Sequence, residues 1–249
     1  MKLRRLLIIV TAFAIAMGFL EAAVVVYLRE ILYPKGFAFP LQPITANLAL
    51  TELLRELATM IMLVSIGFLA AGAMSTRDGA LSTRGRFSTG FAWFIYSFAI
   101  WDILYYVFLY LILGWPESLL TWDVLFLIPT TWTGPVLTPV LASLSMILLA
   151  LIILRRSDSG AESRLPKRIW AGLISGSLVL ITGWIWDYSS HMLENFTVGE
   201  MLQVRNPQVL NWATTYVPES FPWGIYATGL SIILIAIAYY GFYNKKILS

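Results

Sequence analysis

Two pairs of polar residues, each spaced by four positions, are the first candidates for chemistry in this chain. Glu52 and Glu56 form one pair, and Asp187 and the single histidine, His191, form the other. Residues four apart on a helix project from the same face, so each pair would place two polar groups side by side. Like charges at this spacing repel, and a metal ion, a neighbouring arginine or a shared proton would relieve the repulsion between the glutamates. The alternative is a solvated helix start, where acidic residues also favour the helix dipole.

The second pair predicts metal binding or acid–base catalysis. A carboxylate beside an imidazole can bind a metal together with it, or orient the ring from outside the ligand shell. It can equally raise the pKa of the imidazole, so that the ring acts as a general base. We therefore regard Asp187 and His191 as candidate catalytic residues. The alternative is that His191 is an ordinary residue at a membrane surface.

Two single carboxylates, Glu21 and Asp102, lie within otherwise apolar runs. With a helical rise of about 1.5 Å per residue, each lies roughly a third of the way in from one membrane surface. A carboxylate in hydrocarbon must be protonated, hydrogen-bonded, paired with arginine or bound to a cation, which makes it a candidate for function. A purely structural alternative exists for Asp102, because the hydroxyls of Tyr105 and Tyr106 lie about one helical turn away.

The polar positions come from four separate apolar segments but from one membrane depth, and helical bundles can gather such residues in their core. We therefore predict a divalent-metal site formed by Glu21, Glu52, Glu56, Asp102 and His191. An oxygen-rich set with one imidazole suits Zn, Mn, Fe, Mg or Ca, and disfavours copper or haem. No organic cofactor is predicted, since the sequence has no glycine-rich phosphate loop.

The composition restricts the class of protein that contains these residues. The chain has 249 residues, of which 59% are hydrophobic and 12% charged, whereas soluble domains are about 25% charged. The absence of cysteine excludes disulfides, iron–sulfur clusters and cysteine nucleophiles. The net charge of +3 is spread over many short segments, so no nucleic-acid partner is predicted. An integral membrane protein is expected.

Apolar runs of spanning length, about 17–25 residues, occur six times. The runs are Leu6–Leu28, Glu52–Met74, Phe87–Leu113, Pro135–Leu154, Ile169–Asp187 and Trp223–Tyr243. Each should be a helix, because a lone helix satisfies its backbone hydrogen bonds where lipid offers none. The first run is too long for the apolar region of a typical signal peptide, so we expect it to be retained. The fold prediction is an all-α helical bundle with a single transmembrane domain over residues 1–249.

The distribution of basic residues predicts an orientation. When the connecting segments are assigned alternately to two sides, 13 of the 17 Lys and Arg residues fall on the side of both termini. The positive-inside rule then places both termini in the cytoplasm. The predicted location is the plasma membrane, with multiple passes and with the candidate site facing the extracellular or periplasmic side.

The segments assigned to the outer side are long and rich in apolar and aromatic residues, which suggests that function lies there. They comprise residues 33–50, 115–134 and 188–222. Within the second segment, Ser118–Ile128 is apolar but only about half a spanning length, and prolines flank it. It is predicted to be an interfacial or re-entrant helix rather than a seventh span.

These observations favour a metal-dependent site, and three functions remain open. A metal-activated water could hydrolyse a lipid-borne amide, ester or phosphate. A non-catalytic subunit of a larger membrane complex would equally explain the abundant aromatic residues and the apolar outer segments. A small ion- or proton-coupled transporter could use Glu21 and Asp102, but the inner halves of the spans are almost purely apolar. Membrane lipids, a lipid-like substrate or other membrane subunits are the expected partners, and enzyme activity is left open.

Overall fold

Six long helices form most of the part of the chain that the structure describes. The computed structural model describes residues 2–74, 83–128, 130–160, 163–203 and 206–243. The helices are α1 (Lys2–Leu32), α2 (Ala46–Met74), α3 (Thr83–Leu113), α4 (Leu137–Asp158), α5 (Lys167–Leu193) and α8 (Trp223–Tyr243). Each contains a stretch that is long and apolar enough to cross a membrane. The prediction of a mostly helical bundle is therefore confirmed, as is the presence of six helices that are long and apolar enough to cross a membrane.

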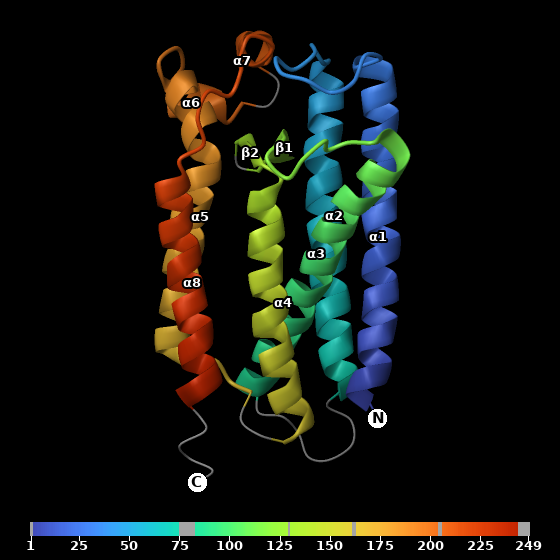
Figure 1. The fold of residues 1–249 in the computed structure, drawn as a ribbon, viewed down its shortest axis with the longest axis vertical. Coiled ribbons are helices and arrows are strands. Elements are labelled where there is room, and N and C mark those ends of the chain that lie inside the picture. Colours follow the sequence, from blue (N-terminus) through green and yellow to red (C-terminus); the bar gives the residue numbers. More distant parts are fainter. Residues whose placement is uncertain (1, 75–82, 129, 161–162, 204–205, 244–249) are drawn as a thin grey trace.

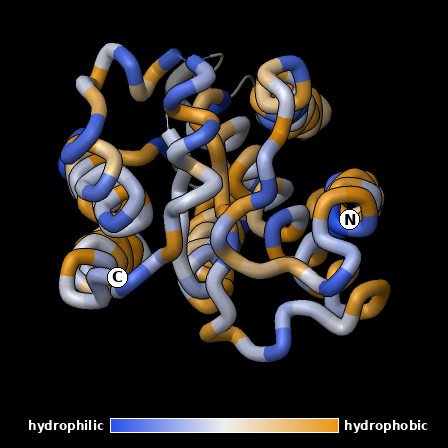
Figure 2. The backbone as a smooth tube through the Cα atoms, turned by 90° about the horizontal axis from the view of Figure 1, so that it is seen from above, coloured by the Kyte–Doolittle hydropathy of each residue, from blue (hydrophilic) through white to orange (hydrophobic). Residues whose placement is uncertain are grey.

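The helices form two groups that lie side by side (Figure 1). Helix α3 packs against α1, α2 and α4, while α5 pairs with α8. Helix α1 begins, and α8 ends, at the same end of the bundle, which we call the terminal end. Seen from above, the helices contain hydrophobic residues, and hydrophilic residues occur in the connecting segments at the near end (Figure 2). This arrangement matters for the site because the α5–α8 pair stands apart from the helices that carry most of the predicted acidic residues.

Small residues allow the paired helices to approach closely. A Cβ atom added to Gly229 of α8 would lie 2.6 Å from the backbone nitrogen of Leu180 in α5. A Cβ added to Gly67 of α2 would lie 2.7 Å from the backbone nitrogen of Phe94 in α3. Helices in membranes associate largely by such close packing, since lipid tails are as apolar as the side chains. These contacts hold α2 against α3 and α5 against α8.

The outer surface of the bundle is apolar, as lipid contact requires. Leu69, Leu111, Ile235 and Phe242 are each about 70% exposed, on three different helices. In water, such a surface would be an aggregation hazard. In a bilayer, these side chains would face hydrocarbon, which agrees with six helices that are long and apolar enough to cross a membrane.

The predicted helix over Ser118–Ile128 is wrong. Trp122–Phe126 forms strand β1, which pairs antiparallel with β2 (Trp132–Pro135), with Asp123 opposite Gly134 and an irregular register between Val124 and Phe126. Short apolar runs flanked by prolines do not distinguish a strand from a helix by pattern alone. The prediction of a strictly all-α fold is therefore corrected, because the structure also contains a two-stranded hairpin.

The hairpin lies at the opposite end of the bundle from the terminal end (Figure 1). Two short helices, α6 (Val198–Met201) and α7 (Pro207–Ala213), lie at this same end. We call it the hairpin end. The hairpin leads directly into α4, β2 contacts α5 and α4, and β1 contributes side chains to the site described next (Figure 1).

Candidate functional site: an acidic cavity at the hairpin end

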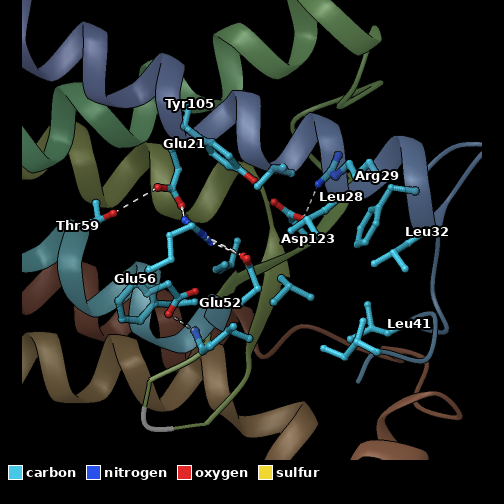
Figure 3. A pocket seen from close by; sticks show the side chains of 18 of the residues that line it. Glu21, Leu28, Arg29, Leu32, Leu41, Glu52, Glu56, Thr59, Tyr105 and Asp123 are labelled. Atoms are coloured by element: carbon cyan, nitrogen blue, oxygen red, sulfur yellow. Dashed lines mark hydrogen bonds and ion pairs between the residues drawn. The ribbon is translucent and has the colours of Figure 1, made fainter. Parts of the chain in front are cut away.

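A cavity of about 210 Å³ lies at the hairpin end, bordered by α1, α2, α3, β1 and the α1–α2 connection (Figure 3). Five carboxylates and two guanidinium groups line it. They belong to Glu21, Glu52, Glu56, Asp102, Asp123, Arg29 and Arg55. Four of the five residues predicted to bind a metal therefore border one cavity. Leucines line the part of the cavity nearest the end of α1, including Leu28, Leu32 and Leu41.

Arg55 forms ion pairs with two of the predicted metal ligands, Glu21 and Glu52. Its guanidinium group contacts Glu21 on α1 and lies 2.9 Å from Oε2 of Glu52 on its own helix. The hydroxyl of Thr59 also donates a hydrogen bond of 3.4 Å to Oε2 of Glu21. Figure 3 shows this chain of contacts between α1 and α2. A positive charge within the protein thus compensates both carboxylates, which was one of the alternatives left open by the sequence.

Glu56 is buried in the cavity wall without such compensation. One carboxylate oxygen accepts a hydrogen bond of 3.0 Å from the backbone N–H of Leu127, which follows β1. Within the described ranges, no basic side chain forms an ion pair with Glu56, although only 8% of the residue is exposed. A buried carboxylate with a single neutral donor is costly to keep ionised. A positively charged group in the cavity would stabilise it.

Asp102 on α3, like Glu56, has a neutral hydrogen-bond donor and, in the described part of the chain, no basic partner. Its Oδ2 accepts a hydrogen bond of 2.8 Å from the hydroxyl of Ser143 on α4, rather than from the neighbouring tyrosines. Among the residues that the structure describes, no basic side chain forms an ion pair with it. Glu56 and Asp102 are therefore two acidic groups of one cavity that have hydrogen bonds but no cationic partner.

A buried ion pair between α1 and β1 was not identified as part of the site from the sequence. Arg29 donates a hydrogen bond of 3.1 Å to Oδ1 of Asp123, and the two residues are only 7% and 2% exposed. The guanidinium carbon of Arg29 also lies 3.6 Å from the ring centre of Trp115. Burial raises the pKa of the Asp123 carboxyl to about 6, while the Arg29 charge acts in the opposite direction.

Two signals in the sequence could have revealed this pair. Asp123 alternates with Trp122 and Val124, and in a strand such alternation places the aspartate on the opposite face from its neighbours. Arg29 is one of only four basic residues assigned to the outer side, where the positive-inside rule makes a basic residue unexpected. The first signal depends on recognising the strand, which the sequence did not distinguish from a helix, and without the strand Arg29 has no evident partner.

Asp187 and His191 lie elsewhere, at the end of α5. The Asp187 carboxylate accepts a hydrogen bond of 2.6 Å from the hydroxyl of Tyr216. The Nδ1 atom of His191 lies 2.8 Å from the main-chain oxygen of Asp187, and its Nε2 atom lies 3.8 Å from Glu219. The carboxylate and the ring therefore have separate partners, and neither residue lines the acidic cavity.

The geometry gives the predicted metal site no support. In the part of the chain that the structure describes, no group of three or more His, Asp or Glu side chains is arranged to hold a metal ion. His191 is on α5, which pairs with α8, whereas the four predicted carboxylates that border the cavity are on α1, α2 and α3. Two of those carboxylates, Glu21 and Glu52, are bound by Arg55.

Comparisons with known proteins add no further constraint. No family model matches the chain, and no curated protein or solved structure matches it either. Function is therefore inferred from the chemistry of the cavity itself.

Proposed function

We propose that this protein binds an organic cation, in the form of an ammonium group, in the acidic cavity. The observation that carries the proposal is the pair of carboxylates without a cationic partner, Glu56 and Asp102, on the wall of one cavity. Uncompensated charge at membrane depth is costly, and a bound cation removes that cost. Five carboxylates against two guanidinium groups leave the cavity with an excess of negative charge.

The size and the lining of the cavity favour an ammonium group over a bare ion. A volume of about 210 Å³ exceeds what a metal ion with ligands at about 2.0–2.6 Å fills. Aromatic rings also border the cavity, including those of Trp101, Tyr105 and Phe126. Ring faces attract organic cations, and quaternary ammonium groups are commonly recognised in this way. Binding rather than hydrolysis is proposed, because the described residues do not form the ligand set that a metal-activated water needs.

The proposed location is the plasma membrane, with the hairpin end facing the extracellular or periplasmic side. The support comes from the basic residues, of which 13 of 17 lie in segments assigned to the terminal end. In this orientation the cavity would take its ligand from the outer leaflet or the outer aqueous phase.

Binding of choline to the purified protein, measured by isothermal titration calorimetry, tests the proposal. The neutral compound of the same shape, 3,3-dimethylbutan-1-ol, serves as the ligand control. We expect saturable binding of choline and none of the alcohol. Glu56→Gln and Asp102→Asn should each weaken choline binding about tenfold or more, equivalent to about 1.4 kcal/mol. Two carboxylates outside the cavity provide matched control variants, Glu117→Gln and Asp158→Asn, and these should bind as the wild type does.

Two results would contradict the proposal. Equal binding of choline and the neutral alcohol would show that charge is not recognised. Saturable binding of a divalent metal that is lost in Glu56→Gln, together with no ammonium binding, would support the metal prediction instead.

A further inference from the structure

A second, larger cavity adjoins the acidic one. Its volume is about 330 Å³, and it lies between the α3–α4 side of the molecule and the α5–α8 pair. Its lining is mostly hydrophobic, including Phe91, Ile95, Leu149, Leu180 and Ile237. Apolar cavities of about 150 Å³ remain dry and hold a benzene molecule, so this one has room for a considerably longer hydrocarbon.

The two cavities share part of their walls. Trp101, Asp102, Leu125 and Phe126 line both of them. Asp102, which lacks a cationic partner, is therefore at the junction between a space that suits a positive charge and a space that suits a hydrocarbon chain. A ligand with both parts would fill the two cavities at once.

Two indole N–H groups indicate that a ligand with a hydrogen-bond acceptor belongs here. The Nε1 atoms of Trp101 and Trp132 are buried and have no hydrogen-bond partner among the described residues. Both tryptophans line the second cavity, and Trp101, only 8% exposed, also lines the first. Buried donors are nearly always paired, and an ester, amide or hydroxyl oxygen of a ligand would pair them. In a lipid, such oxygens lie between the headgroup and the chain.

The second cavity also has an opening through which a chain could enter. Ser177 on α5 lines it and is nevertheless exposed. Since this stretch of α5 belongs to a membrane-spanning helix, the exposed side would face lipid rather than water. A chain could therefore enter sideways from the bilayer while the head reaches Asp102 and Glu56.

We propose that the ligand is a membrane lipid with an ammonium headgroup, and that one of its hydrocarbon chains occupies the second cavity. This inference rests on the proposed function, because the ammonium group is the part that the acidic cavity binds. The apolar lining binds the chain, and the two indole groups bind the oxygens between head and chain.

The test uses the full-length protein in lipid nanodiscs and a series of trimethylammonium compounds with butyl, octyl and dodecyl chains. Each compound competes against labelled choline. Ser177→Phe fills the mouth of the second cavity, and Ser175→Phe, on the same helix but outside both cavities, is the matched control. Partition of each compound into the bilayer is the same for all variants, so differences between variants report the cavity alone.

We expect Ser177→Phe to bind choline and the butyl compound as the wild type does, and to bind the dodecyl compound about tenfold more weakly or worse. Burial of one methylene group raises the affinity about fourfold. Loss of two buried methylene groups therefore accounts for the tenfold decrease. Ser175→Phe should match the wild type throughout. If choline binds but Ser177→Phe leaves the dodecyl affinity unchanged, the chain site is overturned and the ammonium site stands. If no ammonium compound binds the wild type, the proposed function fails, and this inference with it.

Discussion

Single residues decide which carboxylates of the cavity are available for a ligand. Arg55 compensates Glu21 and Glu52, and Arg29 compensates Asp123. Only Glu56 and Asp102 then remain without a cationic partner in the described ranges. The sequence showed that these acids lie at one depth, because depth follows from position along a helix. It could not show which acid each arginine binds, because that depends on how the helices rotate and which of them are neighbours.

Removal of the Arg55 charge should destabilise the protein. In Arg55→Met, Glu21 and Glu52 lose their partner while only 11% and 13% of their side chains are exposed. We expect a loss of about 2–3 kcal/mol in unfolding free energy, since breaking a buried ion pair leaves an uncompensated charge. Thermal unfolding in detergent measures this loss. Adding Glu21→Gln should restore part of it, and an Arg55→Met variant as stable as the wild type would contradict the role given to Arg55.

Asp123 should titrate near pH 6 rather than near its ordinary value of 3.8. Because its pKa is raised in the folded protein, the contribution of this group to stability is fully present below about pH 3.8 and is lost as the pH rises through 6. The infrared spectrum of the wild type minus that of Asp123→Asn would isolate the signal of this carboxyl. The difference in unfolding free energy between the two proteins should change over the same pH interval. A titration midpoint near pH 4 would contradict the burial of the Asp123 carboxyl.

At the scale of elements, the long helices were predictable and the hairpin was not. A run such as Phe87–Leu113 exceeds the length of any ordinary strand, so its hydrophobic length alone identifies a helix. Trp122–Phe126 is only five residues long, and its pairing with Trp132–Pro135 depends on contacts that no local pattern reveals. This strand provides Asp123, and Leu127 directly after it donates a backbone hydrogen bond to Glu56. Missing the strand therefore concealed part of the site.

The pairing of α5 with α8 depends on close approach at Gly229. Gly229→Ala would place a Cβ atom 2.6 Å from the Leu180 backbone nitrogen, so the helices must separate. We expect a loss of about 1–3 kcal/mol in unfolding free energy, as for other overpacked interiors. Gly224→Ala on the same helix meets no atom within 4 Å, so it should unfold as the wild type does. Equal stability of the two variants, measured by thermal unfolding, would show that this contact is unimportant.

At the scale of the whole molecule, the arrangement of the helices separates residues that share one membrane depth. Glu21, Glu52, Glu56 and Asp102 come together because α1, α2 and α3 are neighbours. Asp187 and His191 do not join them, because α5 pairs with α8. Which spans are neighbours is decided by small residues along their faces, and the sequence alone did not show this.

The proposed orientation predicts a difference in accessibility between the two ends. Because the chain has no cysteine, single cysteines can be introduced without background labelling. Glu117→Cys near the hairpin end should react with a membrane-impermeant maleimide in intact cells, and Asp158→Cys at the terminal end should react only after lysis. Labelling in the reverse pattern would place the cavity on the cytoplasmic side.

The central claim is that Glu56 and Asp102 together give the cavity its preference for positive charge. The most direct measurement is the ratio of the affinities for choline and for its neutral analogue, compared between the wild type and the double variant Glu56→Gln/Asp102→Asn. We predict a preference for choline of about a hundredfold or more in the wild type, corresponding to about 2.7 kcal/mol, and a ratio near one in the double variant. A double variant that retains the wild-type preference would contradict the claim.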